Sequence, residues 1–291
     1  MSIIASLKRK IEFAATLAKE PQLIYYRYQA RKMSSRIINL NGLRGSETNN
    51  LLKNGVSQVI LSEKNLGLTK KMAARFDRLL DTGRFHHLPD PERSNTVAFG
   101  SYLYYFNRGW SDWFPEITVV VEENLGDTLR GYFGQGYKIK TVQLARKKHI
   151  DENCPIDDPY SNFWHFDWRK TDKSWLLIVI NLSEQKDNEA FHTLDLATSA
   201  MALKEGYHGR HQPDGLPGAL KTGKIYCAGG PPGTCYIANS ADMLHRAGDP
   251  LPDKNCDVVF VFVGADVPWP NTTGFQYAVN TNQIVSDQGG A

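Results

Sequence analysis

The chain of 291 residues has few cysteines, little net charge and no long hydrophobic run. Its four cysteines (Cys154, Cys227, Cys235 and Cys256) form no C-x-x-C pair and no zinc-ribbon spacing, which is typical of inert thiols in a reducing compartment. The 34 basic and 31 acidic side chains leave a formal net charge of +3, too small to indicate nucleic-acid binding. No apolar run reaches the roughly 18 residues that a membrane span needs. We therefore expect a cytoplasmic protein that binds no nucleic acid.

What remains is an ordinary globular composition, with 41% hydrophobic and 22% charged residues. No internal repeat or low-complexity tract divides the chain. We expect an N-terminal helical segment at residues 1–44 and a single larger domain at residues 45–291.

The N-terminal segment is basic and amphipathic. Apolar side chains recur every three or four residues, which predicts one face of a helix, at Ile4, Leu7, Ile11, Ala14 and Ala18. Between Lys8 and Arg36 there are eight Lys or Arg residues and two Glu residues. Such a helix can lie peripherally on an anionic membrane surface or meet a partner. The simpler interpretation, which we favour, is a helix packed on the main domain with its basic face in water.

After the N-terminal segment, the spacing of apolar residues changes from helical to β-type along the chain. Residues 46–62 predict a short helix, a turn at Asn54-Gly55 and a strand, and helices are predicted within residues 68–80 and 119–129. Short β-type runs separated by turns follow at Tyr137–Ala145, Trp175–Leu182, Lys224–Ala228, Thr234–Ala238 and Val258–Val263. This order predicts an α+β protein with a β-sandwich or jelly-roll core, because no regular helices separate the strands.

One segment, NFWHFDW at residues 162–168, combines metal-ligand residue types with a β-type context. In an extended strand the side chains of His165 and Asp167 would share a face. A third ligand has to come from elsewhere, and the candidate is His245, some eighty residues downstream. Two histidines and one carboxylate on one face of a six-coordinate metal are the ligands of non-haem Fe(II) oxygenases.

These motifs occur in a recognisable order: WHFD, then WLLIVINL, then the loop at residues 186–193, then GTCYIANSADMLHRAG. The set resembles the phytanoyl-CoA dioxygenase-like branch of the Fe(II)/2-oxoglutarate dioxygenases, over roughly residues 45–265. The resemblance implies a double-stranded β-helix (a cupin-like jelly roll) with N-terminal and flanking helices. It also implies that His165, Asp167 and His245 are the iron ligands.

The resemblance further implies a reaction. Fe(II), 2-oxoglutarate and O₂ would yield succinate, CO₂ and a ferryl intermediate that oxidises a small biosynthetic metabolite, for which a carboxylated molecule is a candidate. Halogenating relatives carry a small residue in place of the carboxylate, so Asp167 favours hydroxylation, desaturation or oxidative cyclisation.

The co-substrate site departs from the family pattern, in which a basic residue, usually Arg, follows the distal histidine by about ten positions. No Arg occurs after Arg246, and the nearest basic residue in that window is Lys254, which lacks the planar fork of Arg. Arg146 is a second candidate for binding the carboxylate. Gln143 and Asn181 are candidates for hydrogen bonds to 2-oxoglutarate.

Four residues are candidates for substrate binding. His208 and Arg210 lie in a turn-rich insert and would suit an acidic substrate, although a solvated loop explains them equally well. Trp168 is more simply explained by packing around the metal-binding segment. Arg246 would point away from His245 in a regular strand, and reaches the pocket only if that stretch is irregular.

Two other function classes fit parts of the sequence. A zinc-dependent hydrolase would use the same ligands, but no second carboxylate or histidine stands at a general-base spacing nearby. A non-catalytic β-helix module that binds at a membrane surface through the N-terminal helix has no need of all three ligands. The oligomeric state is not indicated by the sequence.

Overall fold

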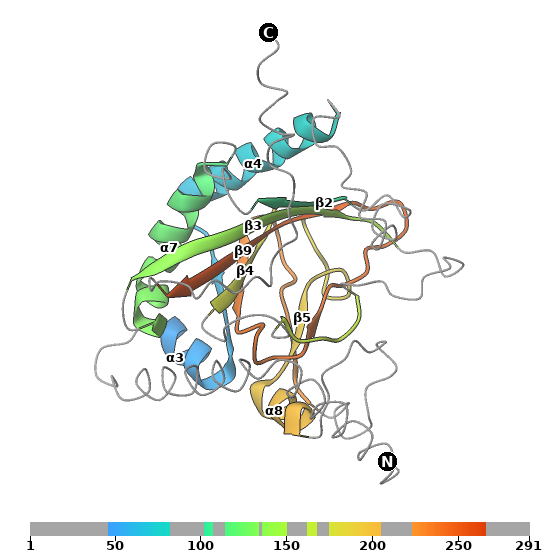
Figure 1. The fold of residues 1–291 in the computed structure, drawn as a ribbon. Coiled ribbons are helices and arrows are strands. Elements are labelled where there is room, and N and C mark those ends of the chain that lie inside the picture. Colours follow the sequence, from blue (N-terminus) through green and yellow to red (C-terminus); the bar gives the residue numbers. More distant parts are fainter. Residues whose placement is uncertain are drawn as a thin grey trace.

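A computed structural model describes residues 46–81, 102–106, 114–133, 136–149, 162–167, 175–204 and 223–265 (Figure 1). Of residues 79–81, 102–106, 203–204 and 265 only the backbone is described. The basic segment at residues 1–44 and the candidate substrate-binding residues Trp168, His208 and Arg210 lie outside these ranges. Within them, no helix is long and apolar enough to cross a membrane.

Four helices are described: α3 (Ser46–Asn54), α4 (Glu63–Asp81), α7 (Glu116–Phe133) and α8 (Leu196–Lys204). In α7 the side chains buried against the domain recur every one to four residues, as an amphipathic helix requires, at Ile117, Val120, Val121, Leu125 and Leu129. The helices predicted within residues 46–62, 68–80 and 119–129 are confirmed, although α4 and α7 begin earlier than their apolar periodicity indicates.

The larger sheet has six strands, all paired antiparallel. Their order is β1 (Val56–Ile60), β7 (Thr234–Ala238), β4 (Trp175–Asn181), β9 (Cys256–Ala265), β3 (Tyr137–Lys147) and β2 (Tyr102–Phe106). Strand β4, with the sequence WLLIVIN, is buried along its whole length, which explains its uninterrupted apolar run.

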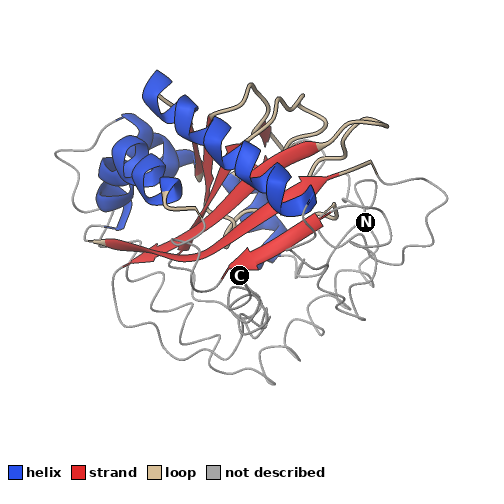
Figure 2. Ribbon diagram, turned by 90° about the horizontal axis from the view of Figure 1, so that it is seen from above, coloured by secondary structure: helices blue, strands red, loops and turns tan. Residues whose placement is uncertain are grey.

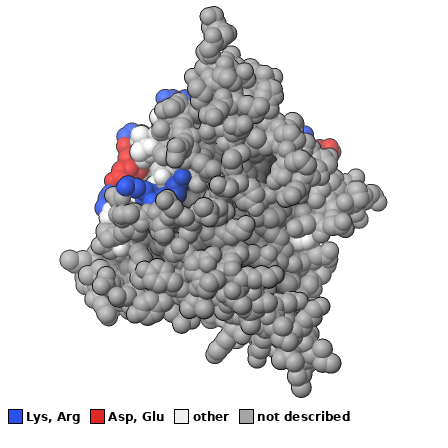
Figure 3. All heavy atoms as spheres, in the orientation of Figure 1, with Lys and Arg blue, Asp and Glu red and all other residues white. Residues whose placement is uncertain are grey.

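Helices α3, α4 and α7 cover one face of this sheet (Figures 1 and 2). Side chains from that face, including Val142, Leu144 and Ile178, form a core cluster with Met72 and Phe76 of α4. Exposed ion pairs connect α4 to α7 and lie within α7, and positive and negative side chains stand next to one another on the helical side in Figure 3. We therefore see no charged patch of a single sign on the described part of this surface.

The opposite face of the large sheet meets a smaller one. Strands β6 (Ile225–Cys227), β5 (His192–Leu194) and β8 (His245–Arg246) form this second sheet, in that order, and its pairings are antiparallel. A second core cluster lies between the two sheets and includes Ala145, Val179, Phe191 and Tyr236. Two facing antiparallel sheets with helices outside one of them confirm the predicted α+β class and β-sandwich or jelly-roll core.

The turn predicted at Asn54-Gly55 is also confirmed. Gly55 has a φ of 77°, a conformation that side-chain-bearing residues rarely adopt. A Cβ atom at this position would lie 2.4 Å from the Sδ atom of Met243. The turn therefore fits closely against the segment that leads into His245.

Candidate metal centre

The segment that carries His165 and Asp167 is not the continuous strand that the sequence predicts. His165 makes a single antiparallel bridge with His245, in which each backbone amide donates to the other residue's carbonyl at 2.9 Å. Asp167 follows in a turn, and its amide donates to the carbonyl of Ser240 at 3.4 Å. The strand prediction was therefore wrong, but these backbone contacts bring the segment against the one that contains His245.

The three predicted ligands meet at one point. Nε2 of His245 lies 3.3 Å from Oδ1 of Asp167, and Nε2 of His165 lies 3.8 Å from the same oxygen. All three potential ligand atoms lie within 4.8 Å of one another. Both histidines are buried, with 8% and 3% of their surface exposed, and Asp167 is partly buried.

Backbone carbonyls orient both imidazoles. Nδ1 of His165 donates to the carbonyl of Phe163 at 2.6 Å, and Nδ1 of His245 donates to the carbonyl of Met243 at 3.0 Å. Because a carbonyl only accepts, these bonds place the proton on Nδ1 and leave the lone pair on Nε2. This is the arrangement by which proteins prepare a histidine to bind a metal.

Asp167 is held in its ionised form. Burial raises the pKa of its carboxyl group, but His245, His165 and a hydrogen bond from Ser240 outweigh that effect and place the pKa at about 2. Two imidazole nitrogens and one carboxylate oxygen are a suitable ligand set for a divalent transition metal. The residues of this site therefore fit the metal ion that the sequence predicts.

The wall beside the metal centre is apolar and aromatic. The ring centroid of Phe191 lies 5.3 Å from that of His245, and 6.2 and 6.3 Å from those of Tyr236 and Phe260. The hydroxyl groups of Tyr236 and Thr193 are hydrogen bonded at 2.6 Å. These side chains fill the space between the two sheets beside His245.

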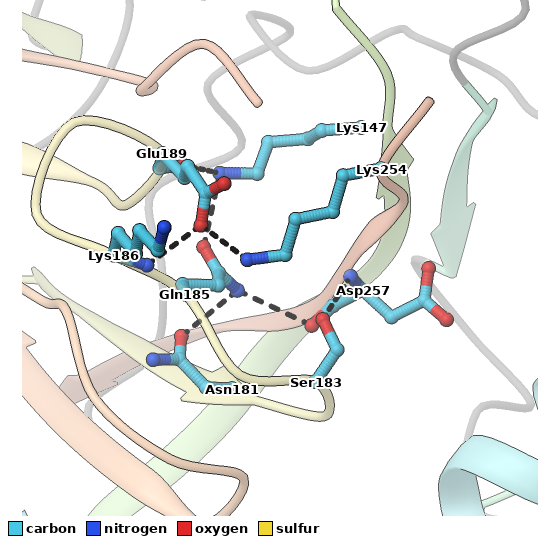
Figure 4. A network of polar contacts seen from close by, with 8 residues as sticks. All are labelled: Lys147, Asn181, Ser183, Gln185, Lys186, Glu189, Lys254 and Asp257. Atoms are coloured by element: carbon cyan, nitrogen blue, oxygen red, sulfur yellow. Dashed lines mark hydrogen bonds and ion pairs between the residues drawn. The ribbon is translucent and has the colours of Figure 1, made fainter. Parts of the chain in front are cut away.

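Two of the candidate co-substrate residues form contacts with other groups of the protein (Figure 4). The ammonium group of Lys254 forms an ion pair of 2.5 Å with the buried carboxylate of Glu189. The side-chain amide of Asn181 donates to the carbonyl of Ala228 at 2.8 Å and accepts from Nε2 of Gln185 at 3.1 Å. The charge of Lys254 is therefore paired within the protein, and both ends of the Asn181 amide have protein partners.

Gln143 is placed differently. It alternates with Val142 and Leu144, which pack against the helices, so its side chain faces the interior between the sheets. It is 8% exposed, and its amide makes no hydrogen bond to another described residue. Gln143 therefore remains a candidate for hydrogen bonding to a bound ligand.

Arg146 lies on the helical side of the sheet, away from the metal centre. Its Nε and Nη2 atoms donate to the two carboxylate oxygens of Asp257 at 2.8 and 2.6 Å, and Nη2 also contacts Asp77 of α4. Its guanidinium group lies over the ring of Phe76 at 5.6 Å. This position contradicts the predicted role of Arg146 in binding the co-substrate. Arg146 stands three residues after Gln143 on β3, so the two side chains face opposite sides of the sheet.

Arg246 follows the regular alternation of β8. It pairs with His192 of β5, while His245 pairs with Thr193. Its guanidinium group lies 5.4 Å from the ring centroid of Trp164, whereas the imidazole of His245 faces Phe191. Arg246 therefore lies on the outer face of the smaller sheet, so its predicted contact with the substrate has no support from this geometry.

Several residues near the site were not predicted from the sequence. Phe191 forms the wall beside His245, and Ser240 hydrogen bonds to Asp167. Lys147 stands four residues after Gln143, on the same face of β3. The alternation of β3 is a signal that could have identified Lys147, whereas nothing local marks Phe191 or Ser240.

Comparisons with known proteins were made by family model, by sequence and by structure. No protein-family model matches the chain, and no curated protein matches it in sequence. Solved structures do match. The structure of EctD from S. alaskensis with 2-oxoglutarate and 5-hydroxyectoine is 14% identical with a TM-score of 0.52, and the match covers 77% of this chain and 76% of that one.

A second similar structure is the epimerase SnoN in complex with Fe³⁺, alpha ketoglutarate and nogalamycin RO, at 12% identity and a TM-score of 0.51. That match covers 75% of this chain and 82% of SnoN. The carbocyclase SnoK from nogalamycin biosynthesis is 11% identical with a TM-score of 0.50, over 77% of this chain and 85% of SnoK. At these identities the likeness establishes the fold alone: the chain has the cupin-like jelly roll of these structures, as its sequence predicts.

Proposed function

We propose that the protein is an Fe(II)- and 2-oxoglutarate-dependent oxygenase that acts on a small metabolite. The observation that carries this proposal is the meeting of His165, Asp167 and His245, from separate parts of the chain, with both Nε2 atoms close to one ionised carboxylate oxygen. Three ligands of this kind leave three positions of a six-coordinate ion open. Similar structures determined with iron and with 2-oxoglutarate lend support.

The residues of the chain would hold and prepare the metal. The carbonyls of Phe163 and Met243 fix the two imidazoles with Nε2 available, and Asp167 supplies a negative charge without first having to lose a proton at neutral pH. When bound, Fe(II) would supply the chemistry of oxygen activation coupled to oxidation of 2-oxoglutarate. The aromatic side chain of Phe191 would exclude water from one side of the site.

The reaction class follows from the same carboxylate. Because Asp167 occupies the third protein position, we propose hydroxylation, desaturation or oxidative cyclisation of the substrate, and not halogenation. His208, Arg210 and Trp168 remain predicted substrate contacts, and an acidic or carboxylated substrate would suit the two basic side chains.

A zinc-dependent hydrolase is the second candidate. A hydrolytic zinc site needs a general base near the metal-bound water. In the part of the chain that the structure describes, the ligand group contains only the three proposed ligands, with no further carboxylate or histidine. The oxygenase therefore accounts better for the whole group.

The test is metal-dependent turnover of the co-substrate. Protein purified without oxygen and loaded with Fe(II) should convert 2-oxoglutarate to succinate when O₂ is admitted. His165→Ala, Asp167→Ala and His245→Ala should each abolish this conversion, whereas His149→Ala, at a partly exposed histidine outside the site, should not. Bound zinc with no conversion of 2-oxoglutarate would favour the hydrolase, and unchanged activity in any of the three ligand variants would refute the proposed site.

A further inference from the structure

Lys147 is a basic side chain on the interior face of the larger sheet. It stands at the end of β3 opposite Cys256 of β9, and shares its face with Gln143 and Ala145. Ala145 packs in the cluster between the two sheets, together with Phe191, whose ring lies against His245. Lys147 therefore faces the same interior as the proposed metal ligands.

The ammonium group of Lys147 has only neutral partners in the part of the chain that the structure describes. Nζ donates to the carbonyl of Glu189 at 2.6 Å and to Oε1 of Gln185 at 3.1 Å (Figure 4). The nearby carboxylate of Glu189 is bound by Lys254 and by the backbone amide of Lys186. Lys147 is thus a partly buried cation with no ion pair to a described carboxylate, which is a costly arrangement unless an anion binds to it.

Two other basic side chains near the site are paired with carboxylates. Lys254 is paired with Glu189, and Arg146 is paired with Asp257 on the helical side of the sheet. Arg246 lies on the outer face of the smaller sheet, over Trp164. Lys147, by contrast, lies on the interior face of β3, and its Nζ hydrogen bonds to the carbonyl of Glu189 and to Oε1 of Gln185, with no described carboxylate as a partner.

We infer that Lys147 binds the carboxylate at the far end of 2-oxoglutarate, the one that does not chelate the metal. This inference rests on the proposed function and gives the co-substrate site a residue that the sequence analysis did not consider. A lysine ammonium group pairs with a carboxylate as a point charge, without the two-pronged contact of Arg. It would therefore select 2-keto acids with an anionic tail over those with an apolar tail.

The experiment compares two 2-keto acids that differ only in this tail. Protein loaded with Fe(II) in the absence of oxygen is titrated with 2-oxoglutarate or with 2-oxopentanoate, which has a methyl group in place of the far carboxylate. Binding is followed by the visible charge-transfer absorption that a chelating 2-keto acid gives with Fe(II). Lys147→Met should weaken binding of 2-oxoglutarate by about 10- to 100-fold, the range for loss of one charge-assisted hydrogen bond, and leave 2-oxopentanoate unchanged.

Two further variants separate charge from structure. Lys147→Arg keeps the charge and should bind 2-oxoglutarate within a few-fold of the wild type. Lys138→Met removes an exposed lysine from the same strand and should leave both affinities unchanged. Thermal unfolding and Fe(II) affinity, measured without a keto acid, report whether each variant is folded.

The remaining outcomes would overturn either this inference alone or the proposed function as well. An equal loss for both keto acids in Lys147→Met would show that the lysine only supports the structure, and no loss would show that another group binds the tail. Either result overturns this inference and leaves the proposed function intact. Wild-type protein that binds Fe(II) but gives no absorption change with either acid would overturn the proposed function and this inference with it. Should Lys147→Met not fold, tighter binding of 2-oxopentanoate than of 2-oxoglutarate by the wild type would refute the inference.

Discussion

A variant of Arg146 can distinguish two roles for this residue. The sequence predicts that it binds the co-substrate, whereas the structure indicates that it stabilises the fold. Its Nε and Nη2 atoms form a two-pronged contact with the carboxylate of Asp257. The side chains of the two residues are only 16% and 12% exposed. Arg146→Met would keep most of the apolar stem but leave that carboxylate without its cation.

The expected loss of stability can be bounded from these contacts. Removing one partner of a fully buried ion pair costs about 3–5 kcal/mol. The residual exposure of this pair reduces the figure, whereas the lost contact between the guanidinium group and the ring of Phe76 adds roughly 0.5–1 kcal/mol. We therefore expect Arg146→Met to lower the free energy of unfolding by about 2–3 kcal/mol.

Urea denaturation measures this change, with two comparisons. Arg146→Met/Asp257→Asn should be more stable than Arg146→Met alone, because the unpaired charge is removed as well. Arg130→Met removes a cation that is 46% exposed and should change stability by less than about 1 kcal/mol. An Arg146→Met protein that unfolds like the wild type but binds 2-oxoglutarate more weakly would refute this reasoning and restore the role in co-substrate binding.

Three other predictions follow from the same structure. Gly55→Ala should lower the free energy of unfolding by about 1–3 kcal/mol in urea denaturation, because a Cβ at its positive φ would meet Met243. Fe(II) at one hundred times its dissociation constant should stabilise the wild type by about 2.7 kcal/mol, with no effect on Asp167→Ala, as thermal unfolding without oxygen would show. Burial lowers the pKa of Lys147 to about 8, against smaller opposite effects of Cys256, Glu189, Cys227 and Asp249. Affinity for 2-oxoglutarate should therefore fall as the pH rises through that value, as the charge-transfer absorption would show, whereas affinity for 2-oxopentanoate should not.

Much of the fold can be predicted from the sequence, because its elements have strong periodicity. Strand β4 is a continuous apolar run and is buried on both faces, while α7 repeats its apolar side chains at helical spacing. The three proposed metal ligands were predicted from residue type and order: a histidine and an aspartate two positions apart in an aromatic segment, and a distant histidine. These predictions could be made because each depends on the local sequence or on the order of segments along the chain.

The conformation around His165 could not be predicted in the same way. An alternating aromatic segment has the pattern of a strand, but a strand also needs a partner of matching length. The partner here is β8, which has only two residues, His245 and Arg246. Pairing between this segment and β8 is therefore limited to the bridge of His165 with His245. Asp167 enters a turn whose contact with Ser240 involves a residue more than seventy positions away.

The roles of the basic residues depend on which face of β3 turns inward, and this is a property of the assembled sheet. Between Ile139 and Thr141 the pairing with β9 shifts by one residue, so that Ile139 and Val142, three positions apart, both pack toward the helices. From there regular alternation sends Arg146 to α4 and Lys147 to the interior. The two neighbours carry the same charge, yet one meets two carboxylates outside the β-sandwich and the other meets only carbonyl oxygens within it. A search for a basic residue at a fixed distance from His245 cannot find Lys147, because the residue reaches the site across the sheet from β3 and not along the chain from β8.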